Sequence, residues 1–324
     1  MKNWQQKLEF APFPPLIASK NLAIRYFAHR DLLEEEVEKI EKLWQLPQVK
    51  KLLSRQQANG SWKYPGGGKT HLRAVEDYNQ IETFRILGEL VEKHGMDKRH
   101  PAIEKAAGYL FSRQTEGGDF RGIYGTQYTP NYSAAIMELL IKAGYGADSR
   151  IEEGFQWLLS IRQNDGGWAV PLRTAAIKFN TGILKVDALK PNTLKPFSHL
   201  VTGVVLRAFA SHEKYRTTEA AKTAGELLAS RFFEKDTYPD RQSADFWLKF
   251  SYPFWFTDLL SSLDSLSRVG FTVDNPQIAK ALEWFTTRQQ ENGAWKLTLL
   301  RGKDKDLSLW ISLAICRVFK RFYG

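Results

Sequence analysis

Five segments of the chain carry apolar residues at helical spacing, and each segment ends at an arginine. Each follows a residue type that commonly opens a helix. The start signals are Pro47, Pro101, Asp148 or Ser149, Thr217 or Thr218, and Asn275-Pro276, and the closing arginines are Arg55, Arg113, Arg162, Arg231 and Arg288. A second, more apolar helix is predicted after each arginine, at about residues 76–93, 132–143, 197–210, 252–268 and 306–322.

The two kinds of helix differ in how polar they are. The first kind keeps charged residues among its apolar ones, as in "PAIEKAAGYLFSR", whereas the second reads "SHLVTGVVLRAFA" or "LSLWISLAICRVF". A helix with apolar residues on most sides is buried, and one with a polar stripe faces solvent. This difference predicts two concentric helical layers. One long leading helix from Leu22 to Leu46 is expected to complete the ring.

The fold expected from this pattern is all-α, a double-layered α/α toroid of about eleven to twelve helices with no appreciable sheet. It forms one domain over residues 1–324, with residues 1–46 as the leading segment and residues 47–324 as five helix pairs. Length alone would also allow two domains of average size.

A turn unit follows three of the closing arginines, with glutamine, a short spacer and Gly-x-Trp. Glycine allows a positive φ, tryptophan covers the end of a neighbouring helix, and glutamine bonds backbone groups at a helix terminus. The units are Gln56, Gly60 and Trp62; Gln163, Gly166 or Gly167 and Trp168; and Gln289, Gly293 and Trp295. Phe120 replaces tryptophan in the second copy, and the copy near Arg231 has lost the glutamine and Gly-x-Trp.

These units resemble the QW repeat of squalene and oxidosqualene cyclases, which protein prenyltransferase β-subunits share in looser form. The resemblance spans about Pro47 to Phe322. It implies an α/α toroid whose inner helices surround a cavity for isoprenoid chains.

The two catalytic signatures of that superfamily are incomplete in this chain. Zinc-dependent prenyl transfer needs Asp, Cys and His ligands, but Cys316 is the single cysteine and the six histidines are scattered. We therefore expect no metal and no cofactor. Asp304-Lys305-Asp306-Leu307 resembles the Asp-x-Asp-Asp motif of class II terpenoid cyclases, with Leu307 in place of the last aspartate. The resemblance makes Asp306 the proton donor, supported by Asp304; the alternative is that Asp306 is a helix N-cap.

The loops before the inner helices meet at one end of such a ring and supply the candidates for a pocket. The candidate substrate-binding residues are Tyr78, Asn79, Glu82, Tyr132, His199, Trp247, Tyr252, Trp255, Asp258 and Trp310. Aromatic faces stabilise cations but also pack cores, and a histidine at a helix start is often structural. A carboxylate within an apolar helix needs a partner or a wet cavity.

Composition narrows the classes of partner and compartment. Apolar residues make up 43% of the chain and aromatic residues 13%, so a large folded interior is expected. One cysteine and no apolar run long enough for a membrane span favour the cytoplasm. The net charge of +10 is spread along the chain without a nucleic-acid motif, which excludes a dedicated nucleic-acid face and allows peripheral association with an anionic membrane.

Three functions are compatible with these features. The first is binding, and acid-initiated transformation, of an isoprenoid or other apolar substrate in the central cavity. The second is a non-catalytic toroid scaffold that binds a lipid, peptide or protein. The third is a polysaccharide lyase or glycosidase, which would use two carboxylates and sugar-stacking aromatics.

Overall fold

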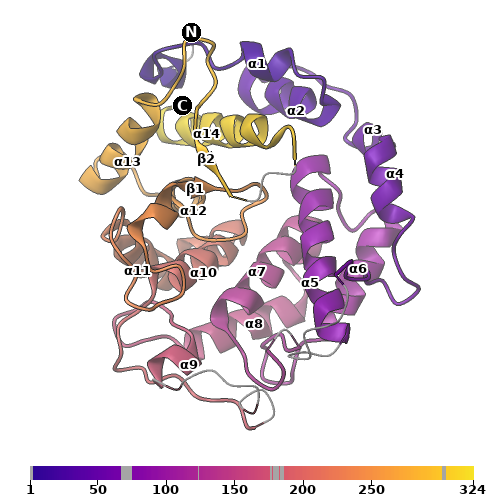
Figure 1. The fold of residues 1–324 in the computed structure, drawn as a ribbon, viewed down its shortest axis with the longest axis vertical. Helices are drawn as coiled ribbons and strands as arrows, with labels where there is room; N and C mark the ends of the chain where they lie inside the picture. The colour runs from indigo at the N-terminus through magenta and orange to yellow at the C-terminus, as the bar shows by residue number, and fades with distance from the viewer. Residues whose placement is uncertain are drawn as a thin grey trace.

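The computed structural model describes residues 3–66, 75–122, 124–175, 177, 182, 186–300 and 304–324. Its helices form the α/α toroid expected from the sequence (Figure 1). The inner layer consists of α5 (Val75–Gly88), α7 (Pro130–Leu140), α10 (His199–Ser211), α12 (Leu259–Val269) and α14 (Leu307–Tyr323). Two inner helices continue as π-helical turns, η3 (Glu89–Lys93) after α5 and η4 (Ile141–Tyr145) after α7.

The outer layer consists of α4 (Pro47–Leu53), α6 (Pro101–Phe111), α8 (Ser149–Ser160), α11 (Glu219–Ala229) and α13 (Pro276–Thr286). The predicted start signals are confirmed at all five. Asp148, Thr218 and Asn275 each accept a hydrogen bond from a backbone N–H of the first turn, and proline opens α4, α6 and α13.

Burial separates the two layers as the sequence indicates. In α10 every residue except Leu200 and Ser211 is buried, whereas α13 buries one face made of Ile278, Ala281, Leu282 and Phe285. The inner helices follow one another, because α10 packs on both α7 and α12, and α12 packs on α14. Each outer helix from α6 to α13 packs on the inner helix beside it in sequence.

The prediction of one long leading helix from Leu22 to Leu46 is wrong. α2 (Leu22–Phe27) and the π-helical turn η2 (Ala28–Leu33) end where Glu34 takes a positive φ of 60°, and only the short α3 (Glu41–Trp44) follows. Glu34, Glu35 and Glu36 are exposed, and Glu34 and Glu35 lie 2.6 Å from Lys320 Nζ and His29 Nδ1, respectively.

The fourth inner helix also begins later than predicted, at Leu259 instead of Tyr252. Asp258 closes a capping box with Ser261 and so fixes the start of α12. Residues 251–257 form neither helix nor strand, and before them β1 (Lys249–Phe250) pairs in parallel with β2 (Thr298–Leu299). Two further short helices are α1 (Pro14–Ile17) and α9 (Pro171–Thr174).

In two turn units the glutamine links the turn to the next outer helix. Gln56 Nε2 donates to the Ala102 carbonyl in the first turn of α6 (2.8 Å), and Gln114 Nε2 donates to the Arg150 carbonyl in α8 (2.7 Å). Gln56, Gln114 and Gln289 also bond the carbonyl of their own glycine, as Gln56 does with Gly60 (2.9 Å). Gln163 Nε2 instead donates to two carbonyls of the loop before α10. Gln56 and Gln114 therefore hold their turns against the next outer helix.

The tryptophans cover a helix end, but it is the end of their own outer helix and not of a neighbour. The indole N–H of Trp62, Trp168 and Trp295 donates to a carbonyl ten residues earlier, at Leu52, Leu158 and Phe285 respectively. The backbone N–H of Trp62 and Trp168 donates to a threonine hydroxyl of the following inner helix, Thr83 or Thr202, at 2.9 Å. The units of Trp62 and Trp168 thus join the two helices of their own pairs.

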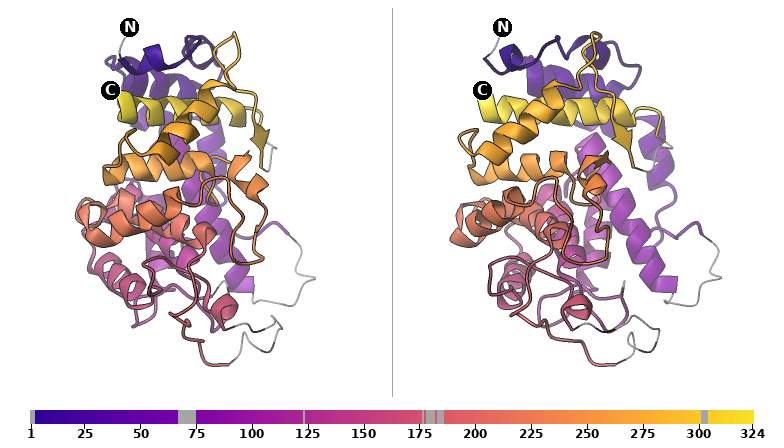
Figure 2. Two further views of the ribbon diagram at one scale, coloured as in Figure 1. Left: turned by 90° about the vertical axis from the view of Figure 1, so that its left-hand side faces the viewer. Right: turned by 60° about the vertical axis from the view of Figure 1, so that its left-hand side comes forward.

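The N-terminal segment closes the ring over α14. The 3-10 helix η1 (Asn3–Lys7), α1 and α2 all pack on α14, and the two chain ends lie on the same side of the molecule (Figures 1 and 2). Gln289 takes part in this closure, because its side chain exchanges two hydrogen bonds with the backbone of Phe10 (3.0 and 2.9 Å). On the other side, Ile40 lies against Gly95 after η3.

None of the helices described is both long and apolar enough to span a bilayer.

Candidate functional site

The segment before α12 enters the middle of the ring. Tyr252 stacks on Trp310 of α14 with ring centroids 5.6 Å apart, and its hydroxyl donates to the Glu92 carbonyl of η3 (3.3 Å). Trp255 contacts Phe84 of α5 edge-on at 5.3 Å. The segment therefore bridges inner helices that lie on different sides of the lumen.

Three cavities surround this segment, and we call them cavities 1, 2 and 3. Trp255 lines both cavity 1 and cavity 3, and Tyr252 lines both cavity 3 and cavity 2. Two aromatic side chains of one segment thus separate three adjoining spaces, of about 520 Å³ for cavity 1, 870 Å³ for cavity 2 and 290 Å³ for cavity 3.

Cavity 1 lies among the N-terminal halves of α5, α7 and α10. Its wall is largely apolar and aromatic, and its volume falls in the range of small-molecule sites. The aromatic lining residues are Tyr64, Tyr78, Phe84, Tyr124, Tyr132, Tyr238, Trp255 and Phe256, and aliphatic residues such as Ile81, Ala135, Leu172, Val201 and Val204 fill the space between them.

The polar groups of cavity 1 are held by neighbours. Arg173 forms a bidentate ion pair with Asp240 (2.5 and 2.6 Å), and the Arg241 guanidinium lies 3.5 Å from the centre of the Phe256 ring. Asn79 accepts a hydrogen bond from the Tyr64 backbone N–H (2.9 Å), which places Tyr64 beside Tyr78. The cavity can therefore enclose an apolar body and present cationic groups to one part of it.

Cavity 3 is small and holds several carboxyl groups. Lys93 Nζ lies 2.8 Å from Glu89 and 2.7 Å from Asp304, and Glu82 pairs with Arg85 at 3.1 Å. Burial raises the pKa of Glu89; Lys93 opposes this shift, and the charge of Asp304 adds to it. A carboxyl group that protonates more readily than usual therefore lies beside Tyr252 and Trp255.

Asp306 lies at the start of α14, outside the described lining of the three cavities. Its Oδ2 accepts a hydrogen bond from Asn21 Nδ2 (2.8 Å), and its backbone N–H donates to Asp304 Oδ1 (2.9 Å). Although it holds the N-cap position, its side chain makes no capping hydrogen bond. Asp306 joins the N-terminal segment to α14, and Asp304 joins α14 to η3.

The other candidate residues divide into two groups. Tyr78, Tyr132 and Trp255 line cavity 1, and Glu82, Tyr252, Trp255 and Asp304 line cavity 3. Trp247, by contrast, packs on Phe232 and donates its indole N–H to the Glu234 carbonyl (2.9 Å). Trp310 supports Tyr252, and Asn79 supports Tyr64.

His199 and Asp258 are buried groups at helix starts. The His199 ring lies 4.5 Å from Trp247, and burial lowers its pKa to about 4 against the opposing charge of Asp236, so its 3.5 Å contact with Asp236 is not an ion pair at neutral pH. Asp258 Oδ1 accepts from the Ser261 backbone N–H (2.7 Å), and burial raises its pKa to about 7.

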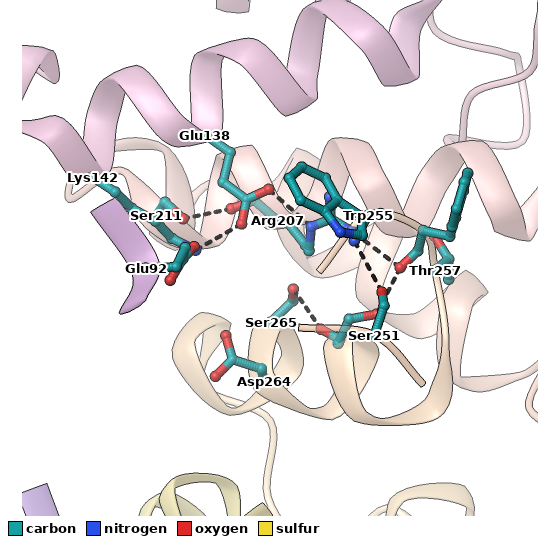
Figure 3. A network of polar contacts seen from close by, with 12 residues as sticks. Glu92, Glu138, Lys142, Arg207, Ser211, Ser251, Trp255, Thr257, Asp264 and Ser265 are labelled. Carbon is teal, nitrogen blue, oxygen red and sulfur yellow. Dashed lines mark hydrogen bonds and ion pairs between the residues drawn. The ribbon is translucent and has the colours of Figure 1, made fainter. Parts of the chain in front are cut away.

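Glu138 belongs to a network of charged residues near the segment before α12, and both of its carboxylate oxygens have a hydrogen-bond partner. Arg207 Nε donates to Glu138 Oε2 (2.8 Å), and Lys142 donates to Glu138 (2.7 Å) and to Glu92 (2.5 Å). Figure 3 shows this group beside Trp255, Ser251 and Thr257. Glu138, in the middle of an apolar helix, thus has the cationic partners that its burial requires.

Sequence reasoning missed Glu89, Lys93 and Arg85 as lining residues of cavity 3, because it treated their helix as an apolar inner helix and did not single out its charged residues. Among the described residues no group of three or more His, Cys, Asp or Glu side chains could hold a metal ion. Cys316 is buried, and burial raises the pKa of its thiol.

Comparison with known proteins gives one family. The model of the squalene-hopene cyclase C-terminal domain matches residues 70–182 and 135–308, which together span most of the chain. The squalene–hopene cyclase of Bradyrhizobium diazoefficiens is 27% identical over 215 residues, covering 63% of this chain and 31% of the relative. The chain therefore spans about a third of the length of that curated relative.

Solved structures give weaker likenesses. A polysaccharide lyase has a TM-score of 0.45 at 12% identity, covering 87% of this chain and 86% of the lyase. A variant of the type II terpene cyclase MstE from Scytonema, in complex with geranylgeranyl dihydroxybenzoate, has a TM-score of 0.34 at 16% identity, covering 84% of this chain and 94% of the cyclase. Both scores are low, so neither structure identifies a ligand of this chain.

Proposed function

Because the chain belongs to the family of the squalene-hopene cyclase C-terminal domain, we propose that it binds an apolar, isoprenoid-like ligand in cavity 1. One observation carries the proposal: a cavity of about 520 Å³ whose wall combines aromatic and aliphatic side chains. Transfer of an apolar chain from water into such a space is favourable by about 25 cal/mol for each Å² buried.

The test is a calorimetric titration of the full chain with geranylgeraniol. Ala135→Phe places a ring in the cavity, and we expect binding to weaken at least about tenfold because the ligand and the new ring compete for space. Ala58→Phe makes the same change at an exposed position of the first turn unit and leaves binding unchanged. If both variants bind as the wild type does, the ligand does not enter cavity 1.

A second variant tests cavity 1 even if Ala135→Phe does not fold. Trp255→Ala removes an aromatic wall instead of adding one, so it changes the affinity for geranylgeraniol without filling the cavity. Thermal melts of each variant separate loss of binding from loss of fold. Wild-type protein that takes up no geranylgeraniol contradicts the proposal directly.

Acid-initiated chemistry on the ligand is the second candidate, and it is favoured by the carboxyl groups of cavity 3. Burial raises the pKa of Glu89, and Lys93 contacts both Glu89 and Asp304. A proton can therefore be held next to the aromatic residues that line cavity 3, Tyr252 and Trp255. Incubation with squalene or geranylgeranyl diphosphate, followed by mass spectrometry, should then give an isomerised or cyclised product. Glu89→Gln and Asp304→Asn should abolish it, and unchanged substrate with wild-type protein would rule this candidate out.

A further inference from the structure

Cavity 2 opens at the opposite ends of the inner helices from cavity 1. Its charged lining residues come from η2, the end of η3 and the loop after it, the start of η4, and α12 and α14. It is the largest of the three cavities, about 870 Å³, and most of its described lining residues are charged. Neither the family resemblance nor the apolar ligand of cavity 1 accounts for this surface.

The described lining of cavity 2 has more basic than acidic residues: Arg30, Arg99, Lys142, Arg268, Arg317, Lys320 and Arg321 against Asp31, Glu92, Asp97 and Asp264. Arg99, Lys142 and Lys320 also pair with carboxylates outside this lining. The surplus of positive charge therefore lies at the arginines that share Asp31 and Asp264. One basic residue in the last turn of a helix complements the helix dipole. α14 alone contributes three, so the dipoles of the inner helices do not explain the surplus.

The surplus is concentrated around one carboxylate. Arg268 Nε donates to Asp264 Oδ2 (3.0 Å), and Arg321 donates to Asp264 Oδ1. Burial favours the protonated form, yet these two guanidinium groups and Lys142 hold the pKa of Asp264 below its usual range. Two arginines thus share a single negative charge at hydrogen-bonding distance.

A third guanidinium group, that of Arg317, lines the same cavity. Arg317 binds Asp31 (2.9 and 2.5 Å) and donates to the Tyr252 hydroxyl (3.3 Å). Burial lowers the pKa of Arg321 although Asp264 opposes it, and the charges of Arg268 and Arg317 lower it further. Three guanidinium groups from two adjacent helices therefore repel one another across a partly buried space.

We propose that cavity 2 binds a small oxyanion of the phosphate type, carrying two or more negative charges, between Arg268, Arg317 and Arg321. Guanidinium groups match phosphate oxygens in geometry as well as in charge, and a multivalent anion relieves their mutual repulsion. Side-chain exposures of 39% for Arg268, 18% for Arg317 and 26% for Arg321 leave these groups accessible from the cavity.

The test uses inorganic diphosphate as the probe and the full chain as the protein. Calorimetry at constant ionic strength should show saturable binding, and Arg268→Gln and Arg321→Gln should each weaken it about tenfold, the effect of losing one charged hydrogen bond. Arg216→Gln, on an exposed arginine of the 3-10 helix Tyr215–Thr217, is the matched control and should bind as the wild type does.

Several results would overturn the proposal. These are no saturable binding, equal affinity in Arg268→Gln and Arg321→Gln, or the same thermal stabilisation by sodium chloride at matched ionic strength. Phosphatidylcholine vesicles with and without phosphatidic acid distinguish the source of the phosphate. Vesicle binding that free diphosphate displaces indicates a lipid headgroup, and binding of free diphosphate alone indicates a soluble ligand.

This site is separable from the proposed function. Diphosphate has no apolar part, so Ala135→Phe should leave its affinity unchanged, and Arg268→Gln should leave the affinity for geranylgeraniol unchanged. Failure of one titration therefore leaves the other intact.

Discussion

Single residues fix the turns between the helices. Gly60 has a φ of +88°, and a Cβ built on it would lie 2.1 Å from the Lys105 carbonyl oxygen of α6. Gly293 has a φ of +82°, and its Cβ would lie 2.0 Å from the Ala11 carbonyl oxygen. Each glycine is required for two reasons: its backbone has a positive φ, and a carbonyl oxygen of a neighbouring segment lies against it.

Gly60→Ala should therefore destabilise the protein by about 2–4 kcal/mol, combining backbone strain with the shift that the carbonyl clash demands. The control is Gly108→Ala in α6, the helix that contacts Gly60. Gly108 is exposed, and nothing lies within 4 Å of its Cβ position. This substitution should stabilise by about 0.5–1 kcal/mol. Urea denaturation measures both, and equal effects would contradict this account of the turn.

Asp258 gives a pH-dependent prediction. Its folded pKa is raised to about 7, so the native state holds the proton more tightly than the unfolded chain. Its contribution to stability is fully present below the unfolded pKa and is lost as the pH rises from about 4 to about 7. Asp258→Asn, which can still cap α12, lacks this loss.

The free energy of unfolding of Asp258→Asn, relative to wild type, should therefore rise across that pH window, by about 4 kcal/mol at most. Denaturation curves at about pH 4.5 and about pH 7.5 are sufficient. A difference between the two proteins that does not change with pH would show that Asp258 is ionised throughout.

At the scale of elements, the hairpin unit was largely predictable. Start residues such as Asn275 act locally, and apolar periodicity follows burial, so helix starts and the two layers could be inferred from neighbouring residues. The predictions of a long leading helix and of an earlier start for α12 were wrong. The conformation of these segments depends on tertiary contacts, since Tyr252 and Trp255 contact α14 and α5 and do not continue the helix.

The same limit applies to the candidate site. Tyr78, Tyr132 and Trp255 could be placed near a pocket because they precede or open inner helices. Cavity 2 could not, because its charges come from η2, α12 and α14 and are brought together only when the ring closes. The positions of Asp304 and Asp306 relative to the lumen likewise depend on closure by Lys93 and Asn21.

Closure itself can be tested at Gln289. Gln289→Ala removes two hydrogen bonds to Phe10 and should cost about 1–3 kcal/mol while making the first residues of the chain more sensitive to protease. Gln290→Ala, at the exposed neighbouring glutamine, should change neither property. If both variants are cleaved at the wild-type rate, the N-terminal segment does not depend on this pair.

At the scale of the whole molecule, the lumen is divided and not open. Trp255 and Arg85 line both cavity 1 and cavity 3, so removal of the Trp255 ring should join the two spaces. Trp255→Ala should therefore bind longer isoprenoids better, relative to short ones, than wild type does. Affinities for farnesol, geranylgeraniol and squalene measure this, with Trp284→Ala on outer helix α13 as the control. An unchanged order of affinities would mean that Trp255 is not the divider.

The central claim is that the aromatic end of the ring holds an apolar ligand. The most direct measurement is photo-crosslinking of the full chain with a benzophenone derivative of geranylgeraniol, followed by peptide mass spectrometry. Adducts should fall on Tyr78, Tyr132 or Trp255 in the wall of cavity 1 and disappear with excess geranylgeraniol. Adducts confined to exposed apolar residues such as Ile17 and Leu22 would contradict the account.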